Sequence, residues 1–311
     1  MPLASRYSQP HAATALMTGV PCRRLLVAAW LLLVFLAGTN YGAAQTFCGN
    51  QQSGLLGDAH QYQFHGNQWN SHFLAVRQCL SVTDTTAPPP AGPSARNIGA
   101  AFDDRNGAPA DYPYFLYGCF HTACTHNTHL PIRVSALASW KITSGATVTQ
   151  PAHMTNDIAY DIWFTQTHTT PADRNTDGTE VMIWVQHLGF ARPIGCCHPI
   201  LRFTDSHGTR WSAYAGFNRN NCGNHCGPRS YGSQVISFVN DDGDAPTADR
   251  TYILDLNEFF HLAQKAGQIQ SDWYLQSIGF GTEIWVGGPG LDFRNFWVKI
   301  APLPVAASHH H

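Results

Sequence analysis

The chain has few charged side chains for its length. Charged residues make up 12% of its 311 residues, about half of the ~25% usual in globular proteins, and the formal net charge is −2. The basic residues are scattered, so the sequence lacks the cluster of positive charge that indicates a nucleic-acid partner. Aromatic residues make up 12% of the chain. A weakly charged, aromatic-rich surface suits a neutral polar partner such as a polysaccharide.

Glutamate is especially scarce, with three residues against seventeen aspartates. Glu258 lies in a stretch with helical spacing, whereas Glu180 and Glu283 lie in apolar, aromatic-rich segments with strand character. A carboxylate among apolar side chains is costly unless it has a partner or a chemical task. Two glutamates placed in this way predict a pair that performs acid/base chemistry.

The sequence also lacks an apolar run long enough to span a membrane. The run at 25–37 has about thirteen residues, whereas a spanning helix needs ~20. Two arginines precede it and small residues follow, which is the pattern of a secretory signal peptide. We therefore expect 1–44 to be removed, 45–303 to form one catalytic domain, and 304–311 to be a disordered tail or tag remnant. The mature protein is expected to be extracellular, monomeric and free of the membrane.

Nine cysteines are present, and Cys22 lies in the expected leader. The even number that remains predicts disulfides in an exported chain. Sequence neighbourhood favours one bridge between Cys48 and Cys79 and another between Cys119 and Cys124. The other four would bridge among themselves: Cys196, Cys197, Cys222 and Cys226.

These last four cysteines, with His198 and His225, also have the ligand types of a zinc site. Export into an oxidising compartment favours disulfides over thiolate ligands. We therefore expect neither a metal nor a cofactor.

The segment 179–185 is typical of a core strand, and alternation places Glu180, Met182 and Trp184 on one of its faces. Residues 158–164 alternate in the same way, with Asp161 on the face that carries Trp163. A polar loop joins the two segments, so we expect an antiparallel pair.

Within this pair, Asp161 could share a proton with Glu180 and shift its pKa. The alternative is a buried aspartate that bonds only to backbone. Further along the chain, Glu283 repeats the arrangement of Glu180, because Trp285 shares its strand face.

Residues 62–80 are predicted to form a hairpin that carries Trp69 among amides, including Asn67. An indole can stack on a sugar ring while amides bond its hydroxyls; the alternative is a tryptophan that caps the core edge. His121, in an aromatic segment, could line the same groove or act as a structural hydrogen-bond donor. A single helix is predicted at 255–267, with Glu258 in a capping box.

Six segments resemble glycoside hydrolase family 12 in order and spacing, and the resemblance covers roughly 47–298. They are Asn67-Gln-Trp69, Gly118-Cys119 with Cys124-Thr125, Tyr160-Asp-Ile-Trp163, Glu180-Val-Met-Ile-Trp184, Pro193-Ile-Gly195 and Gly281-Thr-Glu283.

The resemblance implies an all-β jelly roll of two stacked antiparallel sheets, whose concave sheet forms a cleft for a β-1,4-glucan. It implies a retaining endo-glucanase acting on cellulose-type, mixed-linkage or xyloglucan polymers. The family nucleophile corresponds to Glu180, the acid/base to Glu283, and the hydrogen-bond partner of the nucleophile to Asp161. The expected substrate-binding residues are Asn67, Trp69, His121, Trp163, Met182, Trp184 and Trp285.

Retention requires two carboxyl groups about 5–5.5 Å apart, one ionised and one protonated. We expect Asp161 to keep Glu180 ionised, and Trp285 and Phe280 to raise the pKa of Glu283 by desolvation.

The chain departs from the family at 120–122, Phe-His-Thr, where members often carry His-Trp-Gly or His-Tyr-Gly. This loop borders the cleft and leaves the preferred glucan open. The alternatives are a glycan-binding β-sandwich that does not cut, a related retaining jelly-roll xylanase, or a secreted effector recognised independently of catalysis.

Overall fold

The computed structural model describes most of the chain beyond the expected leader. The described residues are 43–70, 77–84, 91–103, 108–121, 123–168, 177–195, 198–217 and 233–304. They all belong to one compact unit, 41–311. Within them, no helix is both long enough and apolar enough to cross a bilayer. Nearly all of the predicted leader, and all but the first residue of the predicted tail, lie outside the described residues.

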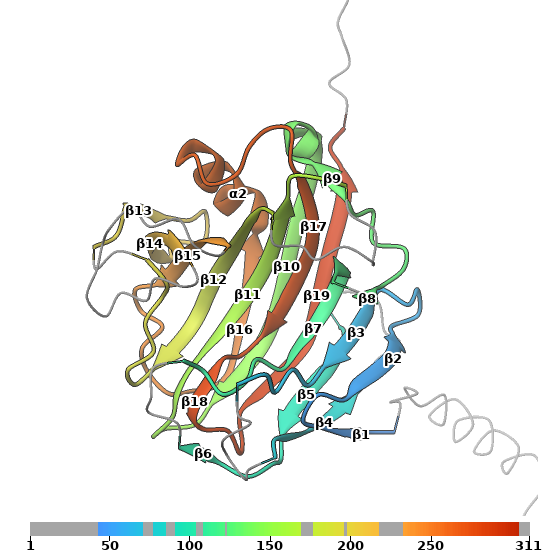
Figure 1. The fold of residues 1–311 in the computed structure, drawn as a ribbon, viewed down its shortest axis with the longest axis vertical. Coiled ribbons are helices and arrows are strands. Elements are labelled where there is room, and N and C mark those ends of the chain that lie inside the picture. The colour runs from blue at the N-terminus through green and yellow to red at the C-terminus, as the bar shows by residue number, and fades with distance from the viewer. Residues whose placement is uncertain are drawn as a thin grey trace, which may run out of the picture. The chain divides into compact units, whose positions relative to one another are not determined.

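Two β-sheets make up this unit, as the sequence predicts (Figure 1). The smaller sheet has the strand order β1-β4-β5-β19-β10-β16. Its strands are β1 (Gln45–Cys48), β4 (Cys79–Thr83), β5 (Ser94–Asn97), β19 (Asp292–Pro302), β10 (Trp140–Gln150) and β16 (Thr247–Asp255).

The larger sheet runs β13-β14-β15-β12-β11-β17-β7-β3-β2, with four short strands attached to this path. Its main strands are β13 (Leu201–Thr204), β14 (Arg210–Phe217), β15 (Gln234–Asn240), β12 (Thr179–Leu188), β11 (Thr155–Thr165), β17 (Tyr274–Gly281), β7 (Tyr114–Phe120), β3 (Tyr62–His65) and β2 (Gln52–Leu56). The short ones are β6 (Phe102–Asp103), β8 (Ala123–Cys124), β9 (Ile132–Arg133) and β18 (Ile284–Gly287).

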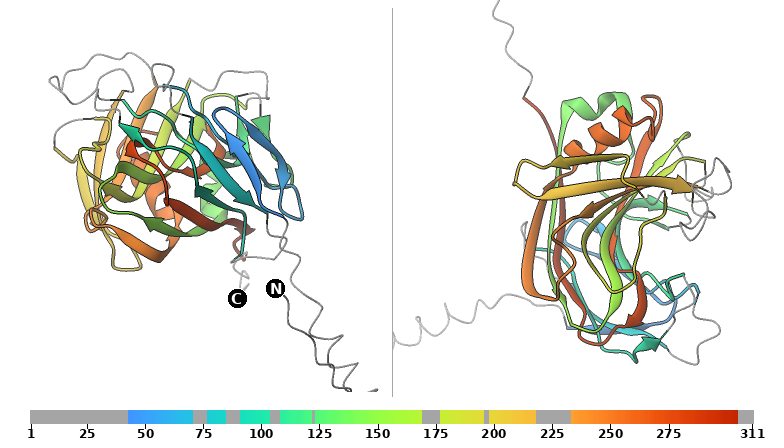
Figure 2. Two further views of the ribbon diagram at one scale, coloured as in Figure 1. Left: turned by 90° about the horizontal axis from the view of Figure 1, so that it is seen from below. Right: turned by 90° about the vertical axis from the view of Figure 1, so that its left-hand side faces the viewer.

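The two sheets stack face to face and bury one continuous core between them (Figure 2). Strand β11 pairs antiparallel with β12 on one side and with β17 on the other. Alternation along β12 sends Val181, Ile183 and Val185 into this core, all fully buried. The opposite face of β11 and β12 is therefore free to form a substrate surface.

One strand pair departs from the predicted antiparallel pattern. Strand β12 pairs parallel with β15, because β13 and β14 reverse the chain twice before β15 returns beside β12. Antiparallel pairing holds for the other strand pairs of the described residues.

The predicted hairpin over 62–80 is wrong. Strand β3 joins β2 and β7 in the larger sheet, whereas β4 joins β1 and β5 in the smaller one. Both segments have strand-like alternation, but the connection crosses between the two layers.

The predicted helix is α2 (Leu256–Lys265), and Asp255 caps it by accepting from the Asn257 N–H. The capping box is wrong: the Glu258 carboxylate accepts from the backbone N–H of Ser206 at 3.1 Å. Glu258 still has a structural role, since it ties the helix to the turn between β13 and β14. A short 3₁₀ helix, η1 (Val134–Ser139), precedes β10.

Candidate active site

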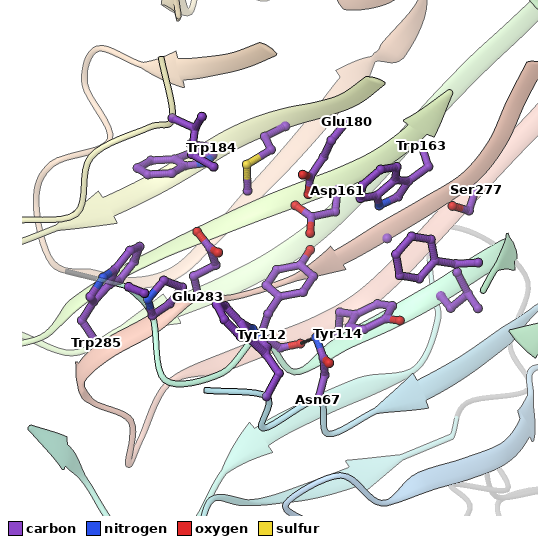
Figure 3. Close-up of a pocket in the computed structure, with 18 of the residues that line it drawn as sticks. Asn67, Tyr112, Tyr114, Asp161, Trp163, Glu180, Trp184, Ser277, Glu283 and Trp285 are labelled. Carbon is purple, nitrogen blue, oxygen red and sulfur yellow. Dashed lines mark hydrogen bonds between the residues drawn. The ribbon is translucent and has the colours of Figure 1, made fainter. Parts of the chain in front are cut away.

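A cavity of about 400 Å³ opens on the outer face of the larger sheet. Its floor comes from β7, β11, β12 and β17, the four strands at the middle of that sheet. Asp161, Glu180 and Glu283 line it together, and Figure 3 shows their side chains extending into the same space. The carboxylates predicted from the sequence therefore meet in one site.

Glu180 and Asp161 lie on adjacent strands, β12 and β11. Their register pairs Asp161 with Met182 and Trp163 with Glu180, which places the two acids diagonally on one face. Their carboxyl groups hydrogen-bond each other, as expected. Burial, together with the charges of Glu180 and Glu283, raises the pKa of Asp161 well above its usual range. Asp161 is therefore the neutral partner, whose O–H donates to Glu180.

Glu283 lies between β17 and β18, and its partner is Asp157 on β11. The Glu283 N–H donates to Asp157 Oδ1 at 3.0 Å, and the Asp157 N–H donates to the Glu283 carbonyl at 3.1 Å. Their carboxyl groups also hydrogen-bond each other. The sequence analysis missed Asp157. The signal was alternation, because Asp157 precedes Asp161 by four residues and so shares its strand face.

Both glutamates hold their protons more tightly than usual. Burial and the charge of Glu283 raise the pKa of Glu180 to about 7, although the bond from Asp161 lowers it. Burial raises the pKa of Glu283 to about 7, although the bond from Asp157 lowers it. The expected separation of the two values is not found. Phe280 does not line the cavity and is fully buried in the core between the sheets.

Two residues just before β7 complete this acidic centre, and the sequence analysis missed both. Tyr112 lines the cavity, and its hydroxyl donates to the Ala159 carbonyl at 3.2 Å. Burial raises its pKa well above the usual range, and the nearby carboxylates, first among them Asp161, raise it further. Asp111 is fully buried, and neither of its carboxyl oxygens has a hydrogen-bond partner among the described residues. Neither residue carries a signal in the sequence.

Aromatic side chains extend the cavity to both sides of the carboxyl groups. Figure 3 shows Trp184 and Trp285 on one side, and Trp163 with Ser277 on the other. Trp184 is buried, and its indole N–H has no acceptor among the described residues. Six of the seven predicted substrate-binding residues line this cavity: Asn67, Trp69, Trp163, Met182, Trp184 and Trp285.

Trp69 and Asn67 enter from the segment that follows β3. Trp69 is 50% exposed, which leaves an indole face open to solvent at the cavity wall. The Asn67 side-chain amide donates to the Tyr112 carbonyl at 3.2 Å, and the backbone carbonyl of Asn67 accepts from the Tyr112 N–H. The amide of Asn67 thus fixes the wall to the cleft floor.

His121 is not among the residues that line the cavity, so its part in substrate binding stays a prediction. The chain turns out of β7 there with a φ of 50°, and the ring packs edge-on against Phe120 at 4.1 Å between centroids. Phe120 lines the cavity instead and lies 5.0 Å from Trp163, also between ring centroids.

Two disulfides confirm the predicted pairing, Cys48 with Cys79 and Cys119 with Cys124. The first joins β1 to β4 at the edge of the smaller sheet, and the second joins β7 to β8 beside the cleft. Cys196, Cys197, Cys222 and Cys226 lie outside the described residues, as does His225.

Comparison with known proteins gives consistent matches. The sequence model described as Glycosyl hydrolase family 12 matches residues 60–301. Endoglucanase S of Pectobacterium parmentieri is 32% identical over 194 residues, which cover 61% of this chain and 65% of that protein. Xyloglucan-specific endo-beta-1,4-glucanase A of Aspergillus niger is 29% identical over 162 residues, covering 51% and 56%. The chain thus spans less than two thirds of the length of either relative.

A solved structure extends the likeness in fold. Endoglucanase cel12A from Rhodothermus marinus superimposes with a TM-score of 0.66 at 24% identity, covering 83% of this chain and 100% of that one.

Proposed function

This chain belongs to glycosyl hydrolase family 12, and on that premise we propose that it is a secreted endo-β-1,4-glucanase that cleaves with retention of anomeric configuration. Its substrates would be cellulose-type, mixed-linkage or xyloglucan polymers. The observation that carries the proposal is the convergence of Glu180 and Glu283 in one aromatic-lined cavity, each hydrogen-bonded to an aspartate of β11. The two glutamates also interact electrostatically.

In the first step Glu180 attacks the anomeric carbon while Glu283 protonates the leaving oxygen, so a glycosyl ester forms as the glycosidic bond breaks. In the second step Glu283 takes a proton from water, which displaces Glu180 and restores both side chains. Asp161 supports the first step because its O–H stabilises the ionised form of Glu180.

The aromatic walls would bind the polymer on either side of the cleaved bond. Trp69 offers an open indole face, and Trp163 and Phe120 form a second apolar surface. Stacking of sugar rings on such faces needs no charged groups, which agrees with the low charge of the chain. Lining residues on both sides of the carboxyls favour attack within a chain over attack at its end.

Secretion rests on two observations. The basic and apolar pattern before residue 45 is that of an exported protein. The two disulfides are the bonds expected in an oxidising compartment.

The test is an activity panel with the purified mature chain. Carboxymethylcellulose, barley β-glucan, xyloglucan and xylan are each incubated with wild type, Glu180→Gln and Glu283→Gln, and reducing ends and viscosity are followed. An endo-glucanase lowers the viscosity of a glucan early, and both variants lose this activity. Binding to glucan without release of reducing ends would favour the glycan-binding sandwich. Release from xylan alone would favour the xylanase.

A further inference from the structure

Several hydrogen bonds join Asp157 to Glu283, although the expected mechanism gives Asp157 no role. The backbone N–H of each residue donates to the other residue, and the two carboxyl groups also hydrogen-bond each other. Asp157 is fully buried, and its Oδ2 receives no N–H from the described residues. Since carboxylates only accept hydrogen bonds, a bond between two carboxyls requires a proton on one of them.

The surroundings indicate which residue holds that proton. The titratable groups that face the pair are Asp161 on β11, Glu180 and His187 on β12, and Asp111 and Tyr112 before β7.

Most of these groups are acids. The exception is His187, which is opposite Asp157 in the β11–β12 register and whose pKa is lowered by burial. Arg192 lines the same cavity but bonds to the carbonyl of Ala191. Burial, then the charge of Glu283, raises the pKa of Asp157 well above its usual range. The more deeply buried acid is thus the neutral one.

We propose that Asp157 is a positioning residue for Glu283: a neutral carboxylic acid whose O–H donates to the Glu283 carboxyl. This bond holds Glu283 against the glycosidic oxygen in the first step and against the attacking water in the second. This inference rests on the proposed function. When Glu283 gives its proton to the leaving alcohol, Asp157 keeps its own and donates to the new carboxylate. When water returns a proton to Glu283, the same bond persists in its weaker, neutral form.

Strand β11 therefore carries one neutral acid beneath each glutamate. Asp161 donates a hydrogen bond to Glu180. Asp157, four residues earlier on the same face, donates one to Glu283. The arrangement gives both glutamates a donor that costs no net charge in a buried site.

Two substrates separate this role from a structural one. A polymer needs Glu283 to protonate its poor leaving group. A dinitrophenyl cello-oligosaccharide does not, because dinitrophenolate departs without protonation. We expect Asp157→Ala to lower kcat/KM on barley β-glucan at least about tenfold, since general acid catalysis is worth ~10²–10⁴. On the aryl glycoside the same variant should lose less than about threefold, because only the acid/base is disturbed.

The second variant, Asp157→Asn, keeps an oxygen for the Glu283 N–H and an N–H for its carboxyl. We expect it to fold like wild type and to lose less polymer activity than Asp157→Ala. Removing the donor destabilises the ionised form of Glu283, so in Asp157→Ala the basic limb of kcat/KM should move to higher pH. Asp157→Asn keeps a donor, so its limb should move less. Asp205→Asn is the matched control, a buried aspartate outside the cavity that accepts from Trp211 Nε1. It should leave this limb in place.

Each outcome decides between the readings. Equal losses on both substrates with no change in the basic limb would make Asp157 merely structural. A limb that moves to lower pH would mean that Asp157 is ionised in the wild type. Either result overturns the inference while leaving the proposed function intact. A folded wild type that releases no reducing ends from any glucan would remove both.

Discussion

The carboxyl group of Asp161 hydrogen-bonds that of Glu180 across the β11–β12 pair. Burial and the charge of Glu283 hold the pKa of Glu180 at about 7, and the bond from Asp161 keeps it from rising further. The proposed nucleophile can therefore lose its proton near neutral pH even though it is enclosed by protein. In this geometry Asp161 stabilises the charge of Glu180 without adding a charge of its own.

Alanine variants of the two proposed catalytic glutamates should differ in whether azide restores their activity. Glu180→Ala and Glu283→Ala are each expected to lose nearly all activity on barley β-glucan, with unchanged circular dichroism. On a dinitrophenyl cello-oligosaccharide, Glu283→Ala should still form the glycosyl ester, and added azide should release it as a β-glycosyl azide. Azide should not restore Glu180→Ala in this way. A folded Glu283→Ala variant with near-wild-type turnover of the polymer would exclude its role.

Stability should depend on pH through the same glutamates. Their pKa values are about 7 in the folded chain against 4.5 ordinarily, so the folded state binds more protons between these values. Their contribution to stability is therefore greatest at low pH and declines as pH rises from about 4.5 to about 7. Glu180→Gln and Glu283→Gln should raise Tm relative to wild type at pH 8 and change it less at pH 4. Variants that melt below wild type at pH 8 would contradict the buried-charge account.

Trp69 should contribute to substrate binding and little to folding. Because half of its surface is exposed, Trp69→Ala is expected to leave Tm unchanged while raising KM for glucan roughly fivefold, a loss of about 1 kcal/mol. Ile253→Ala, at a similarly exposed site on β16 in the other sheet, is the matched control and should leave KM alone. A large fall in Tm for Trp69→Ala would show that the indole caps the core.

The core between α2 and the larger sheet should be sensitive to Phe259. Its ring lies within 5.5 Å of the ring centroids of Trp211, Phe238 and Phe203, all in edge-on contacts. Phe259→Ala is expected to reduce the free energy of unfolding by about 3–5 kcal/mol. Phe190→Ala, at a 40% exposed turn, should cost less than about 0.5 kcal/mol in the same urea titration. Equal costs would place Phe259 outside the cooperative core.

The sequence predicted which face each side chain of a strand occupies better than it predicted which strands are neighbours. Alternation correctly placed Asp161 and Glu180 together, because the side-chain period of a strand is fixed by its backbone. The failed 62–80 hairpin depends on which sheet a strand joins, and the parallel β12–β15 pair depends on which strand becomes its neighbour. Local alternation holds no information on either.

The same limit applies within the site. Trp69 and Trp163 were found from residue type and spacing, and both line the cavity. Alternation places Asp157 on the same face as Asp161, but nothing in the sequence distinguishes it from the other sixteen aspartates. Asp111 and Tyr112 gain their importance only from the acids that the fold brings beside them.

The central claim is that Glu180 attacks the sugar and Glu283 exchanges the proton. The most direct measurement is the mass spectrum of peptides from enzyme treated with a 2-deoxy-2-fluoro cello-oligosaccharide that carries a dinitrophenyl leaving group, which slows breakdown of the glycosyl ester. We expect one added glycosyl unit, attached to the peptide at Glu180. A label on Glu283 or Asp161, or an active enzyme that never becomes labelled, would contradict the account.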